Sequence, residues 1–398
     1  MKSKKTITFL LFILLFTTKI LASDTAVDGI YYNFDKSNST AKVTYKGAED
    51  DWMYDYTGEE QYTGNLVIPS HVTFEGKEYT VVGFDDEALI GSKLLETLTI
   101  PATVTSFGNY VFTYCNSLHT IIIDQNNPIF FTYSGVMYRK SPSLELFFVP
   151  RAIKGNIEIY NGITTIPSSA FQYTKISGVT IPSSVSLIKD GAFNNCTQLQ
   201  NVTIGNNVTN IGKESFSQCS SLREIEIPSS VKTIEASAFS SNSYLSKVKL
   251  NEGLETIKPY AFSYCYSLSS IYLPSTLNLI EDKAFWECTS LKKITNASDL
   301  NIEIGSTTNG YVAYYATEII EQTLSLEKTN TDNLNAFSTR ENIVISNAKD
   351  QYINIYNVLG ECVYSQACAT NSIQIPISKT GIYIVKIGLF SKKLIVRN

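Results

Sequence analysis

Residues 181 to 204 read IPSSVSLIKDGAFNNCTQLQNVTI, and the apolar skeleton of this stretch recurs at a fixed step through most of the chain. The phenylalanine of its Ala-Phe pair marks the register. Equivalent residues, which we call the register phenylalanines, recur at a nearly constant step, at Phe171, Phe193, Phe216, Phe239, Phe262 and Phe285. The same step separates Leu89 from Phe112. Such a repeat is typical of a solenoid, because one unit cannot bury its own apolar face and must stack on neighbours.

Each repeat predicts two apolar walls and an outer turn. The alternation in Leu199 to Ile204 predicts a short strand with one face inward. Prolines end several such strands, since they lack the N–H that a ladder needs, at Pro69, Pro101, Pro182, Pro228 and Pro274. Val185 and Ile188, with their equivalents, predict the second wall. Phe193, Cys196 and Leu199 follow at steps of three, which predicts a helical turn on the outer side.

The pattern IPxxVxxIxxxAFxxCxxLxxVxI, followed from about residue 85 to 296, resembles the BspA-like leucine-rich repeat family. Ser215 and Val111 depart from it by replacing the alanine before the aromatic residue. The resemblance implies a right-handed, strand-lined solenoid. It also implies a surface protein, since members are mostly implicated in adhesion to host or neighbouring-cell components. We therefore expect a β-rich solenoid over residues 86–322, built from leucine-rich repeats of about 23 residues.

Two regions depart from the period. Residues 24–85 carry strand signals and predict an N-terminal β cap that covers the open edge of the first repeat. In this cap, packing of Trp52, Tyr54 and Tyr56 is favoured over a binding loop. The long gap between Phe112 and Phe171 predicts a hairpin inserted near residues 125–150, with its turn at 141–143, a variation also similar to the family.

Residues 1–23 combine three early lysines, an apolar run from Phe9 to Phe16 and small residues at 22 and 23, which predicts a signal peptide. The run is shorter than the roughly 20 residues that span a bilayer, so a signal peptide is favoured over an anchor, and we expect no transmembrane span in the mature chain. Removal of residues 1–23 leaves 28 basic against 37 acidic side chains, a net charge of −9. An acidic exported chain is a poor partner for nucleic acid.

The C-terminal region changes pattern. Residues 323–340 are polar and predict a linker, and short alternating runs over 341–398 predict a small β-sandwich. The segments INIYNVLGE, TGIYIVKI and SKKLIVRN resemble the type IX secretion sorting domain. The resemblance implies recognition by the secretion machinery, passage across the outer membrane, and a sorting role for Gly360, Gly381, Tyr383, Lys386, Lys392 and Lys393. An ordinary accessory sandwich with a basic tail is the alternative.

Five of the seven cysteines share one slot, three residues after the register position, at Cys115, Cys196, Cys219, Cys265 and Cys288. Export makes disulfides between neighbouring repeats possible. Thr174 and Asn242 fill the same slot elsewhere, so free buried thiols at a packing position are favoured. Cys362 and Cys368 are a further candidate pair, across a turn.

The outward positions of the strands form the face on which solenoids usually bind. Our candidate partner-binding residues are Asn201, Thr203, Glu224, Glu226, Lys247, Lys249, Ser270, Tyr272 and Lys293. Strands about 4.8 Å apart place Glu224 and Glu226 beside Lys247 and Lys249. A lateral charge ladder, worth about 0 to 1 kcal/mol per exposed pair, explains these charges without a ligand and is the favoured interpretation. A recognition patch with Tyr272 at its edge is the alternative.

Catalysis finds no support, because His71 and His119 lie outside any metalloprotease or nucleophile motif. The shared cysteine slot comes with no second ligand type, so we expect no metal and no cofactor. The sequence predicts a secreted, non-enzymatic surface protein that binds a protein or glycan on a host or neighbouring cell. The alternatives are a carbohydrate-binding accessory module of a secreted polysaccharide-degrading system and a structural surface-layer component.

Overall fold

The structure is a computed structural model. It describes residues 26–45, 61–321, 335–338, 342–349, 351–359, 361–377, 379–387 and 390–396. The predicted signal peptide, the three cap aromatics at 52, 54 and 56, and most of the predicted linker lie outside these residues. The chain forms two compact units, described separately below. The first takes in residues up to Ile294 with Ile302–Glu318, and the second Thr295–Asn301 with residues from Ile319 onward.

The N-terminal cap is a mainly antiparallel sheet of order β1-β2-β3-β6-β5. Its strands are β1 (Ala26–Val27), β2 (Ile30–Asp35), β3 (Thr40–Val43), β5 (His71–Phe74) and β6 (Lys77–Phe84). Strand β4 (Gly64–Val67) lies within the predicted cap but pairs in parallel with β7 (Leu95–Ile100), so the first coil of the solenoid begins inside it. Strand β8 (Ser106–Phe107) joins the end of β6 in parallel.

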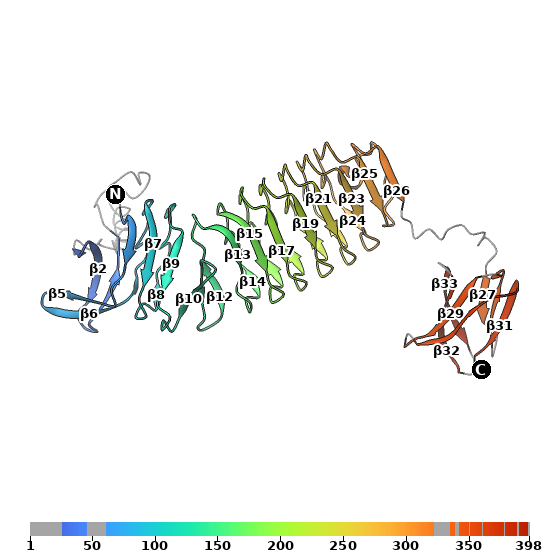
Figure 1. Cartoon of the computed structure of the whole chain (residues 1–398), viewed down its shortest axis with the longest axis horizontal. Helices are drawn as coiled ribbons and strands as arrows, with labels where there is room; N and C mark the ends of the chain where they lie inside the picture. The colour runs from blue at the N-terminus through green and yellow to red at the C-terminus, as the bar shows by residue number, and fades with distance from the viewer. Residues whose placement is uncertain are drawn as a thin grey trace, which may run out of the picture. The chain divides into compact units, whose positions relative to one another are not determined.

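The predicted inward-facing strands stand side by side along the solenoid (Figure 1). We call them the first strand column. It begins with β4, β7 and β9 (Thr120–Ile123), and continues with β13 (Lys154–Glu158), β15 (Lys175–Ile181), β17 (Asn201–Ile204), β19 (Glu224–Ile227), β21 (Lys247–Leu250), β23 (Ser270–Leu273), β25 (Lys293–Asn296) and β26 (Glu318–Glu321). Ladder hydrogen bonds join β13, β15 and β17, then β19 and β21, and then β23, β25 and β26. The ladder is therefore interrupted between β17 and β19 and between β21 and β23.

The second apolar wall forms a continuous six-stranded parallel sheet, the second strand column. Each strand has two residues and ends in a buried isoleucine. The strands are β14 (Thr165–Ile166), β16 (Leu187–Ile188), β18 (Asn210–Ile211), β20 (Thr233–Ile234), β22 (Thr256–Ile257) and β24 (Leu279–Ile280). Both predicted walls are therefore confirmed.

The outer segment of each coil, such as residues 189–198, is not the predicted helical turn. Among the described residues the one helix is η1 (Asn309–Tyr311), a 3-10 turn. Two residues per coil have a positive φ, for example Glu214 (55°) and Gln218 (58°). These reversals turn alternate N–H groups toward the next coil, so that Phe193 donates to the carbonyl of Ser215 at 2.7 Å. The step of three residues from Phe193 to Cys196 and Leu199 therefore fits this hydrogen-bonded outer segment as well as it fits a helix.

The register phenylalanines pile into one column, as the repeat predicts. All six are fully buried. Successive rings lie 4.8 to 5.4 Å apart between centroids, with planes inclined by 16° or less. Each coil therefore shares its interior with the coils on either side.

The shared cysteine slot is a hydrogen-bonding position. All seven cysteines are free. In four coils the thiol donates to the carbonyl of the preceding register phenylalanine, as Cys196 does to Phe171 at 3.0 Å. Asn242 donates instead to Phe216, at 2.9 Å, and Thr174 donates to Phe171 within its own coil, at 2.7 Å. The slot accepts Cys, Thr or Asn because each supplies a short donor, and burial raises the pKa of Cys288 to about 12.

The insertion is larger than the predicted hairpin. It contains three antiparallel strands, β10 (Phe130–Tyr133), β11 (Val136–Arg139) and β12 (Glu145–Phe148). The predicted turn at 141–143 joins the last two, while a second turn at Ser134-Gly135 divides the first segment, where both residues have a positive φ. An ion pair between Arg139 and Glu145 closes the end of the β11–β12 pair.

The C-terminal unit contains the predicted small sandwich. One sheet has the order β27-β28-β31 and the other β30-β29-β32-β33. The strands are β27 (Asn335–Ser338), β28 (Asn342–Ser346), β29 (Tyr352–Asn357), β30 (Cys362–Ala367), β31 (Ser372–Pro376), β32 (Gly381–Ile387) and β33 (Phe390–Val396). Ile343, Ile353 and Val385 meet in one buried core. Strand β27 lies inside the segment predicted as linker, so the sandwich begins before residue 341.

Candidate binding face

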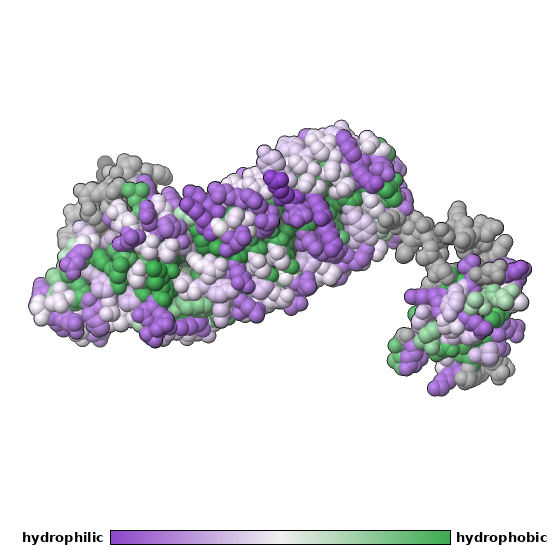
Figure 2. Space-filling model, in the orientation of Figure 1, coloured by the Kyte–Doolittle hydropathy of each residue, from purple (hydrophilic) through white to green (hydrophobic). Residues whose placement is uncertain are grey.

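The structure places the nine predicted face residues on the outward side of the first strand column. Thr203 neighbours Thr180 in register, and Glu224 and Glu226 pair with Lys247 and Lys249. Eight of the nine are exposed, and Tyr272 is half-buried. Figure 2 shows that hydrophilic areas on the visible side of the solenoid adjoin hydrophobic ones, so polar residues are not spread evenly over it.

The predicted charge ladder is present. Lys249 Nζ lies 2.6 Å from Glu226 Oε1, and Lys247 Nζ lies 3.4 Å from Glu224 Oε2. The hydrogen bond from Lys249, and then that from Asn251, lowers the pKa of the Glu226 carboxyl. All four charged side chains remain more than half exposed, so each pair adds little to stability.

A hollow opens in this face between β17 and β19, where ladder pairing of the column is interrupted. It has a volume of about 440 Å³. It is lined by Val202, Thr203, Ile204, Asn206, Glu224, Ile225, Glu226, Pro228, Lys247 and Lys249. We call this hollow with its charged rim the face pocket. Alternation along a strand predicts which side chains face outward, but carries no signal of where two strands separate, so the sequence did not reveal the pocket.

The structure thus brings five of the predicted residues together at the face pocket and leaves four along the rest of the face. Tyr272 is held against the preceding coil, since its hydroxyl donates to Glu252 at 3.0 Å. Lys293 lies 3.4 Å from Glu318 on β26. Asn201 and Ser270 are exposed on their strands but do not line the pocket.

The histidines lie apart from these residues. The Nδ1 atom of His71 lies 3.0 Å from the hydroxyl of Ser70, and that of His119 lies 2.9 Å from the hydroxyl of Thr120. Both histidines are exposed. Within the described ranges, no three His, Cys, Asp or Glu side chains are grouped so that they could hold a metal ion. The same residues contain no helix with the length and hydropathy of a membrane span.

The predicted sorting residues gather on the last two strands. Gly381 begins β32 and pairs with Val396 near the end of β33. Tyr383 is buried, and its hydroxyl donates to the carbonyl of Lys379 at 2.9 Å. The aromatic ring therefore fixes the entry to β32.

The lysines of this hairpin remain at its surface. Lys386 lies over the ring of Tyr356, 5.6 Å from its centroid. Lys392 donates to the side chain of Asn335 at 3.2 Å, which ties β33 to β27. Lys393 is exposed, and Gly360 lies outside the described residues.

Comparisons with known proteins agree with this architecture. A family model described as a BspA type leucine-rich repeat region matches six copies over residues 70–155 and 164–292, which together exceed half of the chain. A second model, described as a secretion system C-terminal sorting domain, matches residues 338–397. No curated protein matches the chain.

Solved structures of bacterial repeat proteins also match the chain. A leucine-rich repeat protein from Bacteroides ovatus has a TM-score of 0.50 at 23% identity, with 75% of this chain and 76% of that chain covered. One from Eubacterium ventriosum has a TM-score of 0.45 at 21% identity, covering 64% and 70%. A leucine rich cell surface protein from Faecalibacterium prausnitzii has a TM-score of 0.37 at 20% identity, covering 77% and 96%.

The sorting domain at the C-terminus marks the protein as one that is secreted or held at the outer cell surface by the type IX route. The repeats of the chain extend from the cap to the end of the solenoid, and the register phenylalanines lie at their centre. The chain belongs to the BspA-type leucine-rich repeat proteins.

Proposed function

We propose that this secreted surface protein is a non-enzymatic binder that captures a protein or glycan of a host or neighbouring cell through the strand-lined face. The face pocket supports the proposal most directly. A charge ladder alone accounts for the Glu–Lys pairs, but it does not account for a hollow with Val202 and Ile225 in its lining beneath a charged rim. Pockets of this kind combine apolar contact area with a few orienting polar groups.

A charge swap separates recognition from stability. Exchanging Glu226→Lys together with Lys249→Glu keeps an ion pair between β19 and β21 but reverses the charges at the pocket rim. The matched control exchanges Lys232→Glu with Glu255→Lys, a pair at 3.0 Å on neighbouring coils that does not line the pocket. Both double variants should melt within about 2 °C of the parent chain, because exposed pairs add little stability.

The probes are a glycan array and an array of purified cell-surface and matrix proteins, each tested with the full mature chain. We expect a bound probe whose signal falls at least tenfold in the rim swap and less than twofold in the control. A binding signal that is unchanged in the rim-swap variant contradicts a role for this face. Hits confined to polysaccharides of the kind that secreted degrading systems attack favour the accessory-module alternative, while no binding together with ordered self-assembly favours a structural surface layer.

A further inference from the structure

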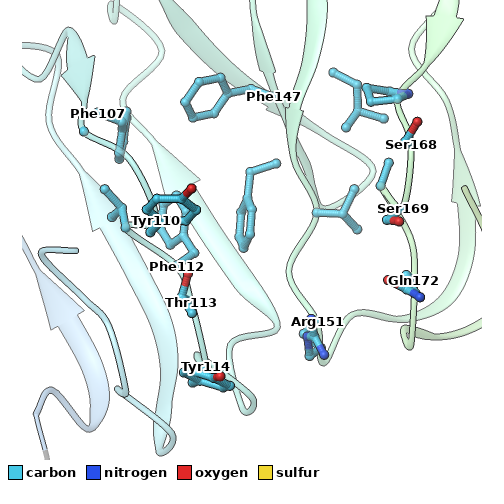
Figure 3. Close-up of a pocket in the computed structure, with 17 residues that line it drawn as sticks. Phe107, Tyr110, Phe112, Thr113, Tyr114, Phe147, Arg151, Ser168, Ser169 and Gln172 are labelled. Carbon is cyan, nitrogen blue, oxygen red and sulfur yellow. The ribbon is translucent and has the colours of Figure 1, made fainter. Parts of the chain in front are cut away.

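A second hollow lies where the insertion interrupts the outer segments of the coils (Figure 3). It has a volume of about 590 Å³, within the range of ligand pockets. Phe107, Gly108 and residues 110–114 form one wall, residues 167–170 with Gln172 form the other, and residues 146–149 with Arg151 complete the lining. We call it the coil slot.

The coil slot stands where one outer segment is missing. Elsewhere, one strand of the first column separates successive register positions, as β15 separates Phe171 from Phe193. Between Phe112 and Phe171 there are two such strands, β9 and β13, with the inserted meander between them. The chain therefore completes an additional coil there without an outer segment of the regular kind.

One wall of the coil slot presents backbone donors. In a regular coil, the N–H groups of Gly191, Phe193 and Asn195 donate to the next coil at 2.7 to 2.9 Å. The positions equivalent to Gly191 and Phe193 in the wall of the slot are Tyr110 and Phe112. Their N–H groups find no acceptor within the described part of the chain. Tyr110 is 73% exposed, in keeping with an open edge.

The opposite wall presents backbone acceptors. The carbonyls of Asp190 and Ala192 accept from Ser169 and Phe171, at 3.1 and 2.7 Å. One coil earlier, the equivalent carbonyls belong to Ser168 and Ala170. Among the residues that the structure describes, no donor reaches either of them. In regular coils the equivalent donors and acceptors are paired with the neighbouring coil, so the two walls together match a chain that supplies both kinds of group.

The lining between the walls is aromatic and incompletely covered. Phe148 stacks on Phe112 with centroids 4.1 Å apart, and Phe147 lies 5.5 Å from Phe107. All four rings are half-buried, whereas every register phenylalanine is fully buried. Figure 3 shows Phe147 between the two walls, with Tyr110 and Phe112 on one side and Ser168 and Ser169 on the other.

We propose that the coil slot binds a polypeptide segment of a partner protein, which takes the place of the missing outer segment. Carbonyls of the bound segment accept from the N–H groups of Tyr110 and Phe112, and its own N–H groups donate to the carbonyls of Ser168 and Ala170. This is recognition by addition to an exposed backbone edge. A wall of donors facing a wall of acceptors fits peptide groups aligned in one direction, as in the other coils.

The chemistry of the segment follows from the lining. Phe148 already packs on Phe112, so the residue of the bound segment that faces these two rings is small. Glycine or asparagine suits the two positions of the segment at which regular coils have a positive φ. This site is separate from the face pocket and does not depend on it.

The test uses a phage library of random nine-residue peptides, selected on the full mature chain. Ser168→Trp places a bulky side chain at the mouth of the slot, and Lys213→Trp is the matched control at the equivalent exposed position of a regular coil. We expect selected peptides to bind Ser168→Trp at least tenfold more weakly and Lys213→Trp less than twofold more weakly than the parent.

Hydrogen exchange on the parent chain gives a second readout that does not depend on how the variants fold. The best peptide should slow exchange at the amides of Tyr110 and Phe112 by tenfold or more. Unchanged exchange there, or peptides that do not distinguish the two variants, overturns the proposal. Glycan-array ligands that lose binding in Ser168→Trp, with no peptide doing so, overturn it in favour of a sugar site.

Discussion

Phe193 and Phe216 stack with their ring centroids 4.9 Å apart and their planes inclined by 7°. They come from successive coils, and the N–H of Phe193 also donates to the carbonyl of Ser215, directly before Phe216. Side chain and backbone thus bind each coil to the next at the same place. Stability in such an array is a sum over coils and the interfaces between them.

Phe216→Ala should lower the free energy of unfolding by about 3 to 5 kcal/mol, because it opens a cavity in the middle of the aromatic column. Tyr244→Ala is the control, since Tyr244 is 65% exposed and its replacement should cost about 0.5 kcal/mol or less. Urea denaturation followed by circular dichroism measures both. Equal losses in the two variants would show that the column is not a continuous core.

Asn242 tests the donor role of the cysteine slot. Its side-chain amide donates to the carbonyls of Phe216 and Phe239, at 2.9 and 2.8 Å. Asn242→Leu should lower the free energy of unfolding by about 1 to 3 kcal/mol, because both buried acceptors lose that donor. Asn242→Cys should be at least as stable as the parent, because a thiol donates in neighbouring coils and the buried Oδ1 atom of Asn242 finds no partner in the described structure. If leucine is tolerated as well as cysteine, the slot requires only size.

Alkaline pH should destabilise the solenoid through its buried thiols. Burial raises the pKa of Cys115 and Cys288 from 9.0 to about 12. Between these values the unfolded chain releases protons that the folded chain keeps. The free energy of unfolding is therefore unaffected by these thiols below pH 9 and falls as the pH rises from about 9 toward about 12.

Denaturation of the parent and of the double variant Cys115→Ser with Cys288→Ser, at pH 8 and pH 10.5, measures this effect. The double variant should lose less stability between the two pH values. A residual loss should persist, since burial also raises the pKa of Tyr62 and Tyr138 to about 12. Identical losses would exclude the thiols as its source.

Deletion of residues 335–398, which takes in β27 with the rest of the sandwich, should leave the repeats folded and prevent surface display, because the matched sorting domain is removed. The measurement is protease accessibility on intact cells of the secreting bacterium, with melting of the purified truncated chain as the folding control. Normal display of the truncation would show that sorting does not need this domain.

The repeat made most of the fold predictable from the sequence. Val185, Ile188 and Leu199 recur at one phase, so strands, walls and the phenylalanine column follow from the need to bury them. The outer segment was not predictable, because Glu214 and Gln218 adopt a positive φ without being glycine, and the step of three from Phe193 to Cys196 also fits a helix. The sequence also did not predict that the shared cysteine position supplies a hydrogen-bond donor, as Cys196 does to the carbonyl of Phe171 in the structure.

The sites were predictable only in part. Alternation along strands identified Glu226 and Lys249 as outward neighbours, which the ion pair confirms. Ladder pairing is interrupted between β17 and β19, and alternation along a single strand does not predict where such an interruption falls. The coil slot depends on two walls that are far apart in the sequence, at Phe112 and Ala170, and on a coil between them that has no regular outer segment.

The hydrogen bonds of the outer segments join equivalent positions in successive coils, and none of those between regular coils depends on which coil in the array it joins. A whole repeat unit could therefore be duplicated or lost within the regular region while every remaining unit kept an equivalent partner. Each such event would change the height of the array by one strand spacing, about 4.8 Å. Gene-level gain or loss of units would then adjust the reach of this protein from the cell surface without redesigning its interior.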